Sequence, residues 1–159
     1  MKGDPKVIEF LNGVLKGELT AVSQYWLHYR LLEDLGISRL AEYERHESID
    51  EMKHADALME RIFFLEGLPA MQQLNRLRIG ENVPEILQAD LDLEHDAVAL
   101  LRDAVEYADS IRDYPSRDLF ASILRSEEEH IDFIETQQSM IEQMGLANYL
   151  QLQSKPAES

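Results

Sequence analysis

Residues 51–54 read Glu-Met-Lys-His and residues 127–130 read Glu-Glu-Glu-His. Each of these Glu-x-x-His tetrads has a further glutamate 33 residues upstream, at Glu18 and Glu94. A single tetrad occurs easily by chance in a chain this rich in glutamate, but the repeated three-residue pattern does not. Four helices can hold two metal ions when two helices give one glutamate each and the other two give a Glu-x-x-His each. The doubled pattern therefore predicts a four-helix bundle with a dinuclear metal site.

The composition fits one helical domain spanning residues 1–159. The chain is 45% hydrophobic and has only 7 glycines and 5 prolines. It has no cysteine, which excludes disulfides, thiol nucleophiles and iron–sulfur centres. A net charge of −16 argues against nucleic-acid binding, and it serves either to keep the protein soluble or to attract cations. No signal peptide or membrane-spanning run is recognisable, so we expect a cytoplasmic protein with no membrane partner.

Start and stop signals predict an all-α chain. The expected helices cover residues of about 5–35, 38–66, 83–112, 116–144 and a short fifth helix at 147–153. The start signals are Asp4 with Pro5, Ser38, a capping box formed by Asn82 and Glu85, and Ser116. The stop signals are Gly36, Gly67 and Gly145.

The long connection at residues 67–81 determines how the helices are joined. Its 15 residues can reach about 50 Å, and a 30-residue helix is about 45 Å long. We therefore expect it to run the whole length of the bundle, so that the third helix starts near the end where the first helix starts. Each of the two helical hairpins brings its own three metal-ligand candidates to about one height. Two such hairpins joined by a long crossover form the ferritin-like arrangement.

The four glutamates lie on helix faces that are otherwise apolar, and an unpaired buried carboxylate is costly. Either they are exposed or paired with arginine, or they bind metal. Two divalent ions would balance four carboxylates and two neutral imidazoles, and this ligand set favours iron or manganese over zinc or copper. By pseudo-symmetry, Glu51 and Glu127 are the natural bridging ligands. A pair of Fe(II) ions bound in this way can deliver two electrons to oxygen or peroxide.

Several longer segments resemble the bacterioferritin family. They are Met1–Asp4, His46–Asp56, Phe64–Pro69, Ile79–Glu81, Glu127–Asp132 and Asn148–Gln151. The resemblance implies a hollow octahedral shell of two dozen identical subunits, which oxidises Fe(II) and stores it as a ferric mineral. It assigns the ferroxidase ligands as Glu18, Glu51, His54, Glu94, Glu127 and His130, two iron ions per subunit.

The resemblance also implies a second cofactor and further iron contacts. Met52 would be the axial ligand of a b-type haem that two subunits share, although spacing alone would make it an interface residue. His46 and Asp50 match an inner-surface iron site, and a solvated pair on an acidic helix is the alternative. Iron release would involve an associated ferredoxin, whose docking positions correspond to Leu68, Glu81 and Glu85, and ordinary loop and capping roles are the alternative for these three residues.

For other aromatic and histidine positions, the sequence leaves more than one role open. Tyr25 lies two turns from Glu18 and is either an electron donor during oxygen reduction or a core tyrosine. His28 and His95 have no partner recognisable in the sequence and are expected at the surface or behind the ligands. The chain departs from the family pattern at Leu35 and Phe133, where relatives often carry tryptophan, and at Arg45, where tyrosine is frequent.

Three other functions compete with ferroxidase and iron storage. The first is another di-iron or di-manganese oxidase without a storage role, such as an oxygenase or catalase. The second is a DNA-protecting mini-ferritin, which builds its metal site between subunits. The third is a non-catalytic haem-binding or structural bundle.

Overall fold

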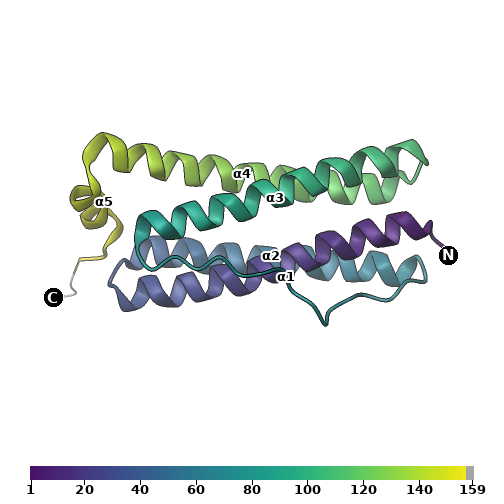
Figure 1. The fold of residues 1–159 in the computed structure, drawn as a ribbon, viewed down its shortest axis with the longest axis horizontal. Coiled ribbons are helices and arrows are strands. Elements are labelled where there is room, and N and C mark those ends of the chain that lie inside the picture. Colours follow the sequence, from purple (N-terminus) through teal and green to yellow (C-terminus); the bar gives the residue numbers. More distant parts are fainter. Residues whose placement is uncertain (157–159) are drawn as a thin grey trace.

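The expected all-α, ferritin-like four-helix bundle is confirmed. The computed structural model describes residues 1–156 and contains five helices in that range. They are α1 (Pro5–Asp34), α2 (Ser38–Phe64), α3 (Val83–Ser110), α4 (Tyr114–Met144) and the short α5 (Leu146–Gln153). The four long helices run side by side, and α5 lies across one end of the bundle (Figure 1).

Two of the expected helix starts are confirmed. The Asp4 side chain accepts hydrogen bonds from the backbone N–H groups of Lys6 and Val7, at 2.8 and 3.1 Å. The Asn82 side chain accepts one from Glu85 N–H at 3.0 Å. These bonds satisfy N–H groups that have no partner within the helix.

The other two expected caps were wrong. Ile37 precedes α2 and makes no capping bond through its side chain, so Ser38 is the first helical residue and not the cap. Asp113 caps α4, because its carboxylate accepts from both the N–H (3.1 Å) and the hydroxyl (2.6 Å) of Ser116. Helix α4 therefore begins at Tyr114, two residues earlier than expected.

Gly67 has a different role from the one predicted. The residue that leaves α2 with a left-handed backbone is Glu66, at φ 63°. Gly67 is required by close packing instead, because a Cβ atom there would lie 2.9 Å from Cγ2 of Ile8. By contrast, Gly36 and Gly145 adopt φ 81° and 82°, as expected of glycines that end helices.

The crossover runs the length of the bundle, as predicted, but it ends at the opposite end from the one expected (Figure 1). Helix α2 returns the chain to the end where α1 starts, so a connection of full length carries it back to the end where α1 finishes. The packing agrees, because the start of α3 at Val83 and Leu87 shares a cluster with Leu32 near the end of α1.

A row of polar side chains on α1 holds the crossover in place. Each accepts a hydrogen bond from a backbone N–H of the crossover. The pairs are Asn12 with Ala70 (2.7 Å), Thr20 with Asn75 (2.9 Å), Gln24 with Arg78 (3.0 Å) and His28 with Gly80 (3.0 Å). Because the last three acceptors are spaced four residues apart, they share one face of α1.

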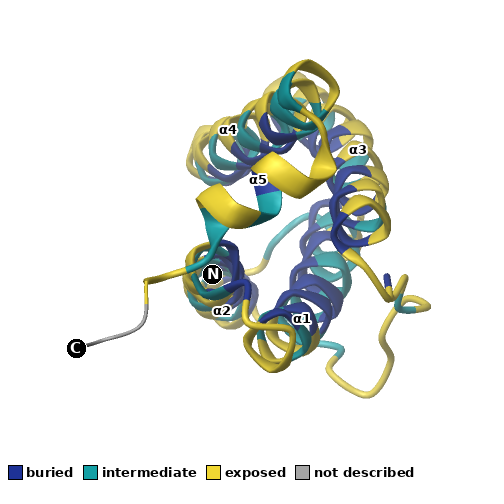
Figure 2. Ribbon diagram, turned by 90° about the vertical axis from the view of Figure 1, so that its left-hand side faces the viewer, coloured by how far each residue is buried: buried dark blue, intermediate teal, exposed yellow. Residues whose placement is uncertain are grey.

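The core has two main apolar clusters, one toward each end of the bundle. One cluster contains Leu11, Leu58 and Phe120, and the other contains Leu40, Ile86 and Tyr149. Seen from the end, the buried faces of the four long helices point toward one another (Figure 2). On each of the four long helices, a buried glutamate lies between residues of one cluster and residues of the other. Within residues 1–156, no helix is long and apolar enough to cross a membrane.

Candidate metal centre

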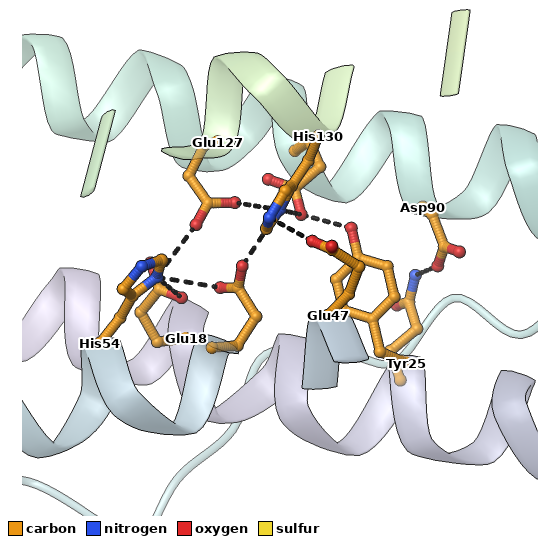
Figure 3. A network of polar contacts seen from close by, with 10 residues as sticks. Glu18, Tyr25, Glu47, His54, Asp90, Glu127 and His130 are labelled. Atoms are coloured by element: carbon orange, nitrogen blue, oxygen red, sulfur yellow. Dashed lines mark hydrogen bonds and ion pairs between the residues drawn. The ribbon is translucent and has the colours of Figure 1, made fainter. Parts of the chain in front are cut away.

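All six candidate ligands meet in the middle of the bundle, one set from each hairpin (Figure 3). Five of the six are buried, and only His54 keeps an intermediate exposure. They come from α1 (Glu18), α2 (Glu51, His54), α3 (Glu94) and α4 (Glu127, His130). The tetrads converge because residues three apart lie on the same face of a helix.

The first half of the centre surrounds His54. Its Nδ1 atom lies 3.4 Å from Glu127 Oε1, 3.6 Å from Glu18 Oε2 and 3.9 Å from Glu51 Oε2. These distances are longer than those of good hydrogen bonds. The four side chains therefore surround a common point without bonding tightly to one another.

The second half surrounds His130. Its Nδ1 atom lies 3.2 Å from Glu51 Oε1, 3.3 Å from Glu127 Oε2 and 3.5 Å from Glu94 Oε1. Glu51 and Glu127 thus belong to both halves, and each turns one oxygen toward each histidine. This is the arrangement expected of two bridging carboxylates between a pair of metal ions.

Many donor atoms of the centre lack a hydrogen-bond partner. The buried atoms without one include Glu18 Oε2, Glu51 Oε1, His54 Nδ1, Glu94 Oε2 and both carboxylate oxygens of Glu127. Buried polar atoms are normally satisfied, so such a concentration indicates a missing partner. No lysine or arginine pairs with these glutamates among the described residues, so the arginine alternative does not hold.

The electrostatics of the metal-free centre show the same deficit of positive charge. Burial, followed by the neighbouring charge of Glu127, raises the pKa of Glu94 well above its usual range. Burial would lower the pKa of His54, but the carboxylates of Glu127 and Glu51 outweigh it and raise the pKa to about 9. The pKa of His130 is raised in the same way, with Glu127 and Glu47 as the main causes. Without metal, the centre therefore retains protons.

Glu47 is a member of this network that the ligand pattern missed. Its carboxylate contacts Nε2 of His130, the ring nitrogen that faces away from the other glutamates (Figure 3). Glu47 lies one turn before Glu51 on α2, and both side chains are on its buried face. A partner on the second nitrogen fixes the orientation of a metal-binding imidazole.

Tyr25 is buried beside the centre. Its hydroxyl donates a 2.5 Å hydrogen bond to Glu94 Oε1, and its ring meets His130 edge-on with centroids 6.3 Å apart. Burial and the charge of Glu94 raise the pKa of Tyr25 well above its usual value, so the phenol keeps its proton.

A pocket of about 410 Å³ leads toward the centre. Its lining includes four ligand carboxylates: Glu18, Glu51, Glu94 and Glu127. The crossover contributes Asn75, Arg76 and Arg78, and the small residues Gly13, Gly17 and Ala97 leave the space open. Arg78 is paired with Asp96 at 2.6 Å. Small molecules can therefore approach four of the six candidate ligands from this side.

None of the remaining candidates belongs to the two groups of four side chains that form the centre. Met52 is 42% exposed on α2. His46 is exposed, and the carboxylate of Asp50 gathers with Glu47 and His130 rather than with His46. The predicted pair of His46 and Asp50 therefore stays a prediction.

His28 is not a surface residue. It is fully buried, its Nδ1 lies 2.9 Å from Asp90 Oδ1, and its Nε2 accepts from Gly80 N–H. Asp90 and Gln24 were missed because their partners come from distant segments. His95 is exposed, as expected.

Comparisons with known proteins agree with this architecture. The family model described as a ferritin-like domain matches residues 8–144. Bacterioferritin from Brucella melitensis is 54% identical over 99% of this chain and 98% of its own length. Bacterioferritin from Rhodobacter capsulatus is 49% identical over 100% and 99%, and that from Streptomyces coelicolor is 47% identical over 94% and 90%. This chain belongs to the ferritin family and, within it, to the bacterioferritins.

Proposed function

We propose that this protein is a ferroxidase that stores iron. Fe(II) is its substrate, oxygen or peroxide is the oxidant, and the ferric product is deposited inside a hollow shell in the cytoplasm. The observation that carries the proposal is the pair of carboxylates, Glu51 and Glu127, which each turn one oxygen toward each of two histidines. Membership of the bacterioferritins supports the storage role.

The proposed centre binds two Fe(II) ions through six side chains. Glu18 and His54 would hold one ion and Glu94 and His130 the other, with Glu51 and Glu127 shared. Four positive charges would neutralise four carboxylates in a buried site, where unpaired charge is most costly. Binding would also displace the protons that the two histidines retain in the metal-free protein.

The two irons would give up two electrons to the oxidant. With peroxide the reaction balances as two Fe(II), one H₂O₂ and two protons forming two Fe(III) and two water molecules. The pocket beneath the crossover would admit the small oxidant to the carboxylates. When oxygen is the oxidant, its reduction to water takes more than the two electrons of the iron pair, and Tyr25, hydrogen-bonded to Glu94, is the candidate donor of one of them.

Stopped-flow absorbance after aerobic addition of two Fe(II) per subunit tests the catalytic assignment. We expect Glu51→Ala to lose the fast oxidation phase, while Glu60→Ala, an exposed glutamate of the same helix, keeps it. Unchanged oxidation in Glu51→Ala would remove the assignment. Continued turnover in the wild type without growth of a mineral core would favour an oxidase with no storage role.

We further propose that Met52 binds a b-type haem shared between two subunits. Its thioether is exposed, and an exposed methionine gives iron a soft sulfur ligand. Leu19 of α1 and Ile49 of α2 are half-buried and would supply apolar contacts to the haem ring. The bound haem would supply one-electron transfer between the outside and the iron store.

The assembly and its partner complete the proposal. We infer a shell of two dozen identical subunits, with His46 and Asp50 as an iron site on its inner surface. An associated ferredoxin would supply electrons for iron release through a surface that includes Leu68, Glu81 and Glu85. All three residues are exposed in the isolated chain, as a docking surface requires.

A further inference from the structure

Two arginines line the pocket that leads to the metal centre, although the substrate proposed for that centre is a cation. The pocket of about 410 Å³ is bounded by Arg76 and Arg78 of the crossover and by five carboxylates, those of Glu18, Glu51, Glu94, Asp96 and Glu127. Positive charge is scarce in this chain, which has 31 acidic residues and only 15 lysines and arginines. Arginines beside this route oppose the entry of Fe(II) by Coulomb repulsion. Their position therefore fits a ligand of opposite charge.

Arg76 is the arginine of this pair that can bind such a ligand directly. Nη2 of Arg78 lies 2.6 Å from Oδ2 of Asp96, whereas Arg76 forms no ion pair with any residue in the range 1–156. The backbone on either side of Arg76 is fixed to α1, because the N–H groups of Asn75 and Arg78 donate to side chains of that helix at 2.9 and 3.0 Å. These two hydrogen bonds hold an uncompensated guanidinium at the wall of the pocket.

The charge of the pocket depends on whether metal is bound. Without metal, the carboxylates of the lining outnumber the two arginines, so an anion is repelled. Two divalent ions would neutralise the four ligand carboxylates, and Asp96 neutralises Arg78, so the charge of Arg76 is left over. Oxidation of both ions to Fe(III) would add two further positive charges in a buried site, where uncompensated charge is costly. A doubly charged anion in the pocket would balance these two charges.

We propose that this pocket binds inorganic phosphate, with Arg76 as its main ligand, and that it does so when the metal centre is loaded. This inference rests on the proposed ferroxidase function. A guanidinium group suits phosphate because its N–H donors match a pair of phosphate oxygens. The small residues Gly13, Gly17 and Ala97 leave room for the anion beside the carboxylates. Phosphate bound here supplies the counter-charge of Fe(III) at the place where Fe(III) forms.

Equilibrium dialysis of the intact protein against radiolabelled inorganic phosphate tests the site without relying on catalysis. The protein is compared metal-free and loaded with two Zn(II) per subunit, because zinc is redox-inert. We expect phosphate to bind the zinc-loaded wild type about tenfold more tightly than the metal-free protein. Arg76→Gln should weaken binding to the zinc-loaded protein about three- to tenfold, and Arg76→Lys, which keeps the charge but loses the paired donors, should weaken it less. Arg39→Gln is the control, because this arginine of α2 is also exposed and does not line the pocket.

The outcomes separate this inference from the function on which it rests. Equal phosphate binding by the metal-free and the zinc-loaded wild type overturns the proposed site. Equal binding by zinc-loaded Arg76→Gln and wild type overturns it as well, because phosphate would then bind elsewhere. A wild type that binds phosphate as expected but does not oxidise Fe(II) overturns the ferroxidase function and leaves the phosphate site in place. The zinc content of every variant is measured in the same samples, so that loss of the metal centre is not mistaken for loss of Arg76.

Discussion

The proton held by His54 makes the stability of the metal-free protein depend on pH. The pKa of His54 is 6.5 in the unfolded chain and about 9 in the fold. At about 1.36 kcal/mol per pKa unit, this difference corresponds to about 3 kcal/mol of stability. Solvent screens part of this free energy because the His54 ring is half-buried, so we expect a contribution of about 2 kcal/mol. Because the folded pKa is the higher one, this stability is fully present below pH 6.5 and is lost as pH rises through 9.

The variant His54→Gln isolates this contribution, because glutamine does not titrate. Between pH 6 and pH 9, the melting temperature of metal-free wild type should fall further than that of the variant by about 4–8 °C. Calorimetry at matched subunit concentrations measures both proteins. With Zn(II) bound, the extra fall should vanish because the metal takes the unprotonated imidazole. An identical pH dependence in the two metal-free proteins would refute the ion pairing of His54.

Three further predictions concern packing, haem and the crossover. Gly67→Ala should cost about 1–3 kcal/mol, since its Cβ would meet the side chains of Ile8 and Ile62 at 2.9 and 3.0 Å. Gly17→Ala, which meets nothing within 4 Å, should be neutral or stabilising by about 1 kcal/mol; equal losses in denaturant midpoint would contradict this packing. Met52→Leu should form intact shells without a Soret band, and retained haem would disprove the ligation. His28→Leu should speed hydrogen exchange at the Gly80 amide while leaving the middle of α1 protected. Unchanged exchange would show that the hydrogen bond from Gly80 to His28 does not protect this amide.

Much of the fold could be predicted from the sequence because helix periodicity and metal chemistry agree there. The apolar stripe of α1 continues on either side of Glu18, so a helix that buries this stripe must also bury the carboxylate. Repetition of the same spacing in α3 and α4 then requires a second set of ligands at the same height. The choice of Glu51 and Glu127 as shared carboxylates followed from pseudo-symmetry, and their oxygens do face both histidines.

The remaining features depend on contacts between distant segments, or on positions where two neighbouring residues give competing local signals. Asp113 and Ser116 are both good capping residues, and only the fold shows that one caps while the other donates to it. Helix α3 begins at the opposite end from the one expected, because α2 has already returned the chain to the end where α1 starts (Figure 1). His28 had no partner recognisable in the sequence, because Asp90 and Gly80 come from α3 and the crossover. No local signal indicated that the ring of Tyr43 on α2 would stack on that of Phe133 on α4.

Anomalous diffraction at the iron edge, from crystals soaked anaerobically with Fe(II), tests the metal centre most directly. We predict two iron positions per subunit, one beside His54 and one beside His130, each contacted by an oxygen of Glu51 and an oxygen of Glu127. A single position, or iron bound elsewhere while these six side chains stay metal-free, would contradict the proposed centre.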